Sequence, residues 1–135
     1  MAIKSLFPKE MLESGEMNLD SIASKLTYFH EQLHLLHWQT TSYAEHMALG
    51  GLYDYVHDFK DGVVEKLMGY TGKRPTGLKL SPISAMPATT VVTDLINFAS
   101  SLRSYAESNG YQDISNLADS LSGEAAKTKY LLTLS

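Results

Sequence analysis

The stretch GYTGKRPTGLKLSPISAMPATT, residues 69–90, decides the fold that we predict for this chain. It holds three glycines and three prolines, and a proline inside a helix removes a hydrogen bond and clashes with the preceding turn. A continuous helix therefore cannot pass through it. A loop of this length is unusual inside a compact domain, so we expect a crossover that runs the length of a bundle, with a short helix near residues 78–84.

Apolar helical patterns lie on both sides of this tract, two before it and two after it. In each, apolar residues recur at steps of three and four, as they do along one buried face of a helix. The expected helices span about residues 18–40, 43–68, 91–109 and 113–132. Asn18 is expected to cap the first helix and Thr89 or Thr90 the third, while Gly110 ends the third.

We therefore predict one all-α domain over residues 1–135, a ferritin-like four-helix bundle with a long crossover between its second and third helices. An ordinary up-and-down bundle with one long loop fits the same pattern. A chain of this length is sufficient for one hydrophobic core.

The composition excludes several classes of site. The chain has no cysteine, which removes disulfides, thiolate zinc sites, iron–sulfur clusters and cysteine nucleophiles and agrees with the cytoplasmic location that we expect. No apolar run approaches the roughly 20 residues that span a bilayer, and the N-terminus lacks the apolar core of a signal peptide. The net charge is −4, and the N-terminal arm carries only Lys4 and Lys9, so we do not expect DNA binding.

Histidines and carboxylates are concentrated in the first two expected helices. His30, His34 and His37 recur at i, i+4 and i+7 on the first helix. One face of the second helix carries His46, Asp54, His57, Asp61 and Glu65. Nitrogen and oxygen ligands on facing helices are how bundle proteins hold transition metals. We therefore expect any metal site in the first half of the chain and scaffold in the second.

Part of this pattern resembles the Dps family, ferritin-like proteins that assemble into shells and oxidise iron between subunits. The matching elements are His37-Trp38 near the end of the first helix, His46 on the second, and the pair Asp61 and Glu65 in Asp-x-x-x-Glu spacing. The resemblance implies an iron site that takes the two histidines from one subunit and the two acids from its partner. The types of ligand leave zinc open as the metal. The resemblance also implies a homo-oligomer, at least a two-fold dimer and in the family a closed shell. The chain also resembles the small ferritin-like proteins encoded by tailed bacteriophages, but no motif in the sequence supports that narrower assignment.

The chain departs from the family in two places. Gly50 stands where the family has an aspartate that bridges two irons, and the connection between His37 and His46 is about three residues shorter. We therefore expect weak metal binding and at most slow iron oxidation, with Asp54 and His57 as the next candidate ligands. Restoring the acid by Gly50→Asp is expected to raise the rate of iron oxidation if the Dps-like geometry is otherwise intact.

Each of these features also has a reading without metal. His30 and His34 are expected to pack or to lie at the surface, Trp38 and Tyr53 to be interface or core aromatics. Acids at i and i+4 are by default a solvated helix face. Three functions therefore compete: a Dps-like metal-binding or iron-oxidising oligomer, a ferritin-like bundle with a structural or protein-interaction role, and a small-molecule binder with a polar pocket between the first two helices.

Overall fold

The structure is a computed structural model, and it describes residues 17–135. Lys4 and Lys9, on which the expectation about DNA rests, lie outside the described residues. The helices are α2 (Leu19–Gln39), α3 (Tyr43–Thr71), α4 (Ala88–Asn109) and α5 (Gln112–Leu132). The described part of the chain contains no β-strand, so the all-α prediction is confirmed.

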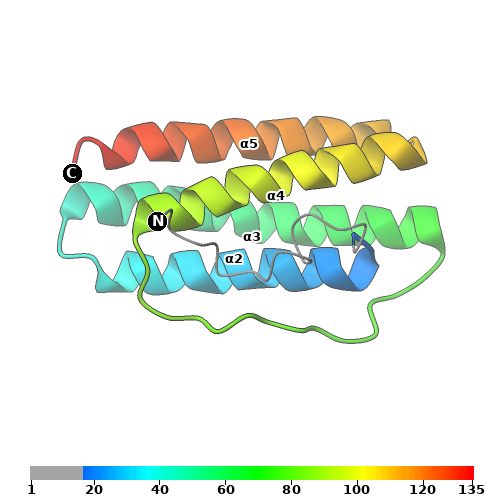
Figure 1. Cartoon of the computed structure of the whole chain (residues 1–135), viewed down its shortest axis with the longest axis horizontal. Helices are drawn as coiled ribbons and strands as arrows, with labels where there is room; N and C mark the ends of the chain where they lie inside the picture. The colour runs from blue at the N-terminus through cyan, green and yellow to red at the C-terminus, as the bar shows by residue number, and fades with distance from the viewer. Residues whose placement is uncertain (1–16) are drawn as a thin grey trace, which may run out of the picture.

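The four helices form two antiparallel pairs, α2 with α3 and α4 with α5 (Figure 1). The pairs meet where α3 packs on α5 and α2 on α4. The crossover, residues 72–87, leaves the end of α3 and returns to the opposite end of the bundle, where α4 begins. Because α3 and α4 consequently run in the same direction, the bundle has the one-crossover connectivity of ferritin-like folds and is not an up-and-down bundle.

The helix ends follow local chemistry, with one correction. Asn18 caps α2 as predicted and forms a capping box with Ser21. Gly110 ends α4 in the left-handed conformation, at φ 76°, which glycine adopts without steric cost. The prediction of a threonine cap for α4 was wrong: the N-cap is Pro87, which makes no side-chain capping bond, and α4 begins at Ala88.

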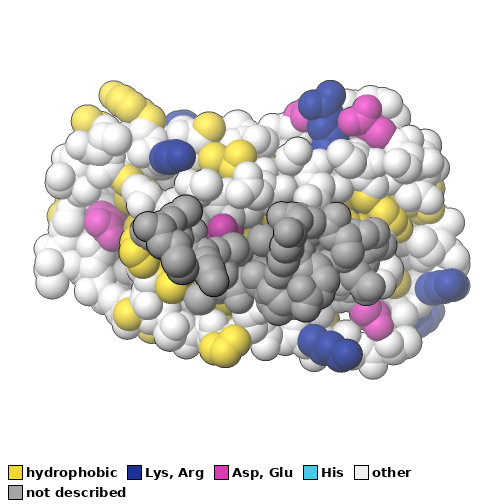
Figure 2. All heavy atoms as spheres, in the orientation of Figure 1, with side chains coloured by type: hydrophobic (Ala, Val, Ile, Leu, Met, Phe, Trp, Pro, Cys, Tyr) yellow, Lys and Arg dark blue, Asp and Glu magenta, His cyan; other side chains and the backbone are white. Residues whose placement is uncertain are grey.

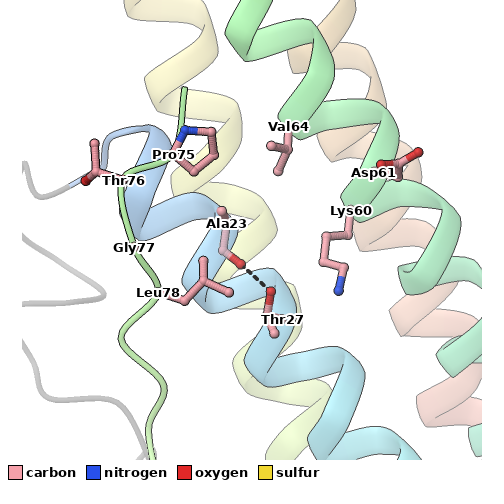
Figure 3. A pocket seen from close by; sticks show the side chains of 9 residues that line it. All are labelled: Ala23, Thr27, Lys60, Asp61, Val64, Pro75, Thr76, Gly77 and Leu78. Atoms are coloured by element: carbon pink, nitrogen blue, oxygen red, sulfur yellow. Dashed lines mark hydrogen bonds between the residues drawn. The ribbon is translucent and has the colours of Figure 1, made fainter. Parts of the chain in front are cut away.

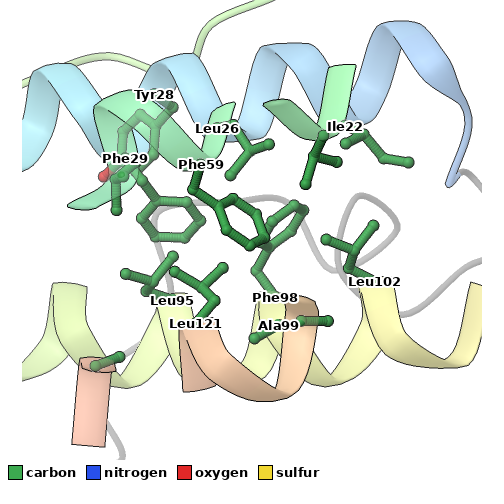
Figure 4. Close-up of a cluster of buried hydrophobic side chains, with 14 of the residues drawn as sticks. Ile22, Leu26, Tyr28, Phe29, Phe59, Leu95, Phe98, Ala99, Leu102 and Leu121 are labelled. Atoms are coloured by element: carbon green, nitrogen blue, oxygen red, sulfur yellow. The ribbon is translucent and has the colours of Figure 1, made fainter. Parts of the chain in front are cut away.

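The core lies between the two helix pairs and contains the predicted apolar stripes (Figure 4). Phe29 of α2 and Phe98 of α4 meet in it with ring centres 5.8 Å apart. The buried stripe residues of the first two helices are Leu19, Ile22, Leu26, Phe29, Leu33, Leu36, Leu49, Leu52, Val56, Phe59, Val63 and Leu67. The pattern that predicted the helices therefore also identified the faces that they bury.

The crossover is tied to α2 by three side chains spaced in multiples of four. Asp20 accepts hydrogen bonds from the backbone and side chain of Thr76, and Ser24 accepts one from the backbone N–H of Lys79, at 3.0 Å. The Gln32 amide bonds both backbone groups of Ser84, donating at 2.7 Å and accepting at 3.2 Å.

The short helix predicted near residues 78–84 does not form. The backbone N–H groups at 79 and 84 bond to α2, which leaves them unavailable for the hydrogen bonds of a helical turn. Large apolar side chains of the crossover remain exposed: Leu78, Leu80 and Ile83. Figure 2 shows the molecule from the side of Figure 1, with apolar side chains scattered over it and no histidine in view. No helix among the described residues is long and apolar enough to cross a membrane.

Candidate functional site

The five histidines of the chain lie together along the contact between α2 and α3. We call this row, with Tyr53, the histidine seam: His57, His30, Tyr53, His34, His37 and His46. Tyr53 of α3 stacks on His30 and His34 of α2, with ring centres 4.6 and 4.1 Å away. Trp38 continues the row at 3.8 Å from His34, and its side chain is 66% exposed. Trp38 is therefore not a core residue.

His37 and His46 join the ends of α2 and α3 through a reciprocal contact. Nδ1 of His37 lies 2.7 Å from the carbonyl oxygen of His46, and Nδ1 of His46 lies 2.9 Å from the carbonyl oxygen of His37. The two rings stack with centres 3.7 Å apart. Because a carbonyl oxygen only accepts hydrogen bonds, each Nδ1 must carry the proton, and each neutral ring then has its lone pair on Nε2.

Gly50 makes room for this contact. A Cβ atom added at Gly50 would lie 2.8 Å from Cε1 and 3.0 Å from Nδ1 of His37, closer than the ring can tolerate without moving. An aspartate at this position would therefore push His37 away from His46 as well as supply a carboxylate. The gain in iron-oxidation rate expected from Gly50→Asp requires an intact Dps-like geometry. Displacement of the His37 ring would break that condition.

Asp61 and Glu65 lie on the exposed side of α3, one helical turn apart. A hydrogen bond with Asp61, followed by repulsion from its charge, raises the pKa of Glu65. The two carboxyl groups are thus close enough to interact. Such a pair attracts a cation, and acids at this spacing are also common on a solvated helix face.

The distance along α3 separates the histidines from the acids. Position 61 lies fifteen residues after position 46, which is about 22 Å along the helix at 1.5 Å per residue. The further candidates Asp54 and His57 are eight and eleven residues from His46, about 12 and 16 Å along the helix. No three histidine or acidic side chains among residues 17–135 come together as a metal site within one chain.

His30, which the sequence suggested was a packing or surface residue, is buried, whereas His34 is only half-buried. Nδ1 of His30 lies 2.8 Å from the carboxylate of Glu31, and no described protein group bonds its buried Nε2. Burial, and then the positive charge of Lys60, lower the pKa of His30 against the opposing effect of Glu31. The His57 ring lies 5.2 Å from that of His30. Sequence reasoning missed this pairing, although His30 and His34 on α2 and Tyr53 and His57 on α3 share a spacing of four.

A separate groove of about 410 Å³ lies between α2, α3 and the crossover (Figure 3). It is lined by Ala23, Thr27, Lys60, Asp61, Val64, Pro75, Thr76, Gly77 and Leu78. Val64 points into it, whereas the Asp61 carboxylate points away from the crossover. None of these lining residues is a histidine, so the groove is distinct from the histidine seam.

Comparison with known proteins identifies a family, but the function of that family is unknown. The model of a family of unknown function (DUF5856) matches residues 37–132, which include α3, the crossover, α4 and α5. No curated protein and no solved structure matches the chain. These comparisons provide no link to Dps or other ferritins, and that resemblance stays a prediction.

Proposed function

The chain belongs to DUF5856, a family of unknown function, and we propose that it is a homo-oligomeric metal-binding bundle that holds a divalent ion, iron foremost, between two copies. The observation that carries this proposal is the tautomer of His37 and His46. Each donates its Nδ1 proton to a main-chain carbonyl, an arrangement usual for histidines that bind metal through the other nitrogen. Both side chains are half-buried, so Nε2 is oriented by the protein and open to a ligand from outside.

The acids supply the complementary half of the proposed site. Asp61 and Glu65 are exposed and held close enough that their interaction raises the pKa of Glu65. An ion between them would replace this repulsion by attraction. Imidazole and carboxylate with open positions for water or oxygen suit iron(II), and imidazole also suits zinc.

A second copy is needed to bring the two halves together. The halves are about 22 Å apart along one helix, too far for one ion. If two copies pair antiparallel through the outer faces of α2 and α3, His46 of each chain approaches Asp61 of the other, with the two-fold axis near the middle of α3. Trp38 and Tyr43, 66% and 76% exposed at one end of this face, would then be covered, as large exposed aromatic groups at interfaces commonly are.

We expect little oxidation chemistry from this site. Gly50 offers no carboxylate to hold a second ion, and His37 occupies the space where a side chain would start. An intersubunit site with one ion would bind iron(II) and oxidise it slowly, because rapid oxidation in ferritin-like centres draws on two irons held close together.

A structural role is the second candidate, and the reciprocal contact favours it. The bonds between His37 and His46 close the connection of α2 to α3, a sufficient reason for both histidines. In that case the chain would be a helical bundle that acts through protein contacts alone.

Metal content and mass in solution separate the two functions. Protein purified from medium with iron or zinc is analysed for metal and for oligomer mass, beside His46→Ala and, as a control in the same seam, His34→Ala. We expect the unaltered chain and His34→Ala to bind metal as dimers or larger assemblies, and His46→Ala to lose the metal. A metal-free monomer, or unchanged metal in His46→Ala, would contradict the proposal.

Acidification gives a second test of the same site. Metal binds neutral imidazole and ionised carboxylate, so protons compete with it at both halves. Metal occupancy should therefore fall as the pH is lowered, whereas a protein-contact role requires no such loss.

A further inference from the structure

We propose that His30 and His57 form a second metal site, a pair of imidazoles within one chain that takes a divalent ion of the zinc and copper class. The site goes beyond the intersubunit site proposed above, because neither His37 nor His46 contributes to it and no second copy is required. It lies at the end of the histidine seam formed by His57, His30 and Tyr53.

The two histidines are oriented in the same manner. Nδ1 of His30 lies 2.8 Å from the Glu31 carboxylate, and Nδ1 of His57 lies 3.3 Å from the Asp58 carboxylate. An ionised carboxylate only accepts hydrogen bonds, so Nδ1 carries the proton in both rings and Nε2 is left with the lone pair. A carboxylate behind the imidazole is the arrangement found in many zinc sites, where it fixes the ring and makes it more basic.

The separation of the rings fits one shared ion. Their centres are 5.2 Å apart and their planes meet at 43°. Zinc–nitrogen bonds measure about 2.0–2.1 Å, so two imidazoles bound to one tetrahedral ion have ring centres about 5 Å apart. His30 comes from α2 and His57 from α3, and the packing of these helices holds the separation without any ion.

Burial supplies an independent reason for a ligand. Nε2 of His30 is buried and bonded by no described protein group, in a residue that is only 8% exposed. An unsatisfied buried nitrogen costs about 1–3 kcal/mol, and coordination would offset this cost. The His57 side chain, 61% exposed, leaves the pair open to solvent on its other side.

The surrounding charges allow binding but keep it modest. Glu31 and Asp58 attract a cation, Lys60 repels it, and His57 contributes the second ring. With no third histidine or acid from the described chain converging here, water would fill the remaining coordination positions. Imidazole ligands with water favour zinc and copper over magnesium or calcium.

Titration with Zn²⁺ alone tests the pair against the other site. His57→Ala, at an exposed position where folding should be unaffected, is compared with His34→Ala in the same seam and with His46→Ala. The pair predicts that His57→Ala weakens one binding event at least about tenfold, while His34→Ala and His46→Ala retain it. Equal Zn²⁺ affinity in His57→Ala and the unaltered chain would overturn the proposal.

Imidazole ¹⁵N chemical shifts identify the ligand atoms directly. On addition of Zn²⁺ the Nε2 resonances of His30 and His57 should move together, at the same stoichiometry, while the Nδ1 resonances keep the signature of a protonated nitrogen. Movement of His37 and His46 alone would overturn the pair and leave the intersubunit proposal standing. Movement of the His30 and His57 resonances without those of His46 would support the pair and count against the intersubunit site.

Discussion

The α2–α3 pair and the α4–α5 pair bury similar apolar stripes but differ in what they place outside the core. All five histidines of the chain lie on α2 and α3, in one row with Tyr53. The α4–α5 pair carries none, and its surface holds ordinary ion pairs, such as those of Arg103 with Glu107 and Asp119. The contrast shows that one core can support two unlike surfaces, one of which carries all the histidines of the chain.

The α2–α3 pair also differs in how its first helix is covered. The core packs on one face of α2, and the crossover is hydrogen-bonded to another through Asp20, Ser24 and Gln32. The crossover thus leaves the histidine seam on the remaining side, facing α3. A change in α4 or α5 should therefore act on stability alone, whereas changes in α2 and α3 should divide between stability and binding.

The largest expected effect is on the core that both pairs share. Phe98→Ala removes a fully buried ring of α4 that meets Phe29 of α2, which should lower the free energy of unfolding by about 3–5 kcal/mol. Urea denaturation measures this loss, and metal bound per folded molecule should not change. A loss below about 1 kcal/mol would mean that the pairs do not depend on one core.

The next effect concerns the attachment of the crossover. Gln32→Ala removes two hydrogen bonds to the backbone of Ser84 from a fully buried side chain, and should lower stability by about 2–3 kcal/mol. Gln39→Ala, at an exposed position of the same helix, is the matched control and should have little effect. Equal losses in the two variants would show that the crossover is not anchored at Gln32.

A smaller effect separates two neighbouring glycines of α3. A Cβ at Gly51 meets no atom within 4 Å, whereas one at Gly50 meets the His37 ring. Gly51→Ala should stabilise the helix by roughly 1 kcal/mol. Gly50→Ala should leave stability almost unchanged, because moving the His37 ring and weakening its hydrogen bond costs about as much as the alanine gains. Thermal denaturation of both variants gives the difference, and equal stabilisation would contradict the contact between Gly50 and His37.

The smallest effect is on the dependence of stability on pH. Hydrogen bonds from the side chain and backbone of Thr76 lower the pKa of Asp20, so in acid the unfolded chain binds this proton more readily than the folded one. The resulting stabilisation is present above the unfolded pKa of about 3.9 and is lost as the pH falls through the lower folded value. Asp20→Asn should flatten this acid limb of stability against pH, and Asp58→Asn, at a side chain 92% exposed, should not. Superimposable curves for Asp20→Asn and the unaltered chain would refute the role of Asp20.

The fold was predictable for two reasons. Apolar residues at helical spacing mark the buried face of each helix, and the prolines and glycines of residues 69–90 exclude a helix there. The errors arose where partners distant in sequence decide the backbone. The hydrogen bonds that residues 79 and 84 make with Ser24 and Gln32 keep residues 78–84 from forming a helix, and nothing within that segment reveals these partners. Likewise, a threonine side chain can accept a capping hydrogen bond and a proline side chain cannot, yet α4 starts directly after Pro87.

The residues of the candidate site were named from the sequence and stay a prediction, whereas their geometry could not be derived from it. Helical spacing placed the histidines and acids on α2 and α3, and the resemblance to Dps selected four of them. The tautomers of His37 and His46 depend on carbonyl oxygens across the connection, and the pairing of His30 with His57 depends on how two helices pack. Neither feature can be predicted from the spacing of residues along one helix. The role of Gly50 as space for the His37 ring was hidden for the same reason.

Complementation between two inactive chains tests the intersubunit site most directly. His46→Ala lacks a proposed histidine ligand, and Asp61→Asn lacks a proposed acid, so each variant alone should bind little metal at this site. Refolded together in equal amounts, they should recover roughly a quarter of the unaltered capacity, because half of random two-fold pairs are mixed and each mixed pair holds one intact site of two. A mixture that binds no more metal than the separate variants, while the unaltered chain binds it fully, would show that no site is shared between copies.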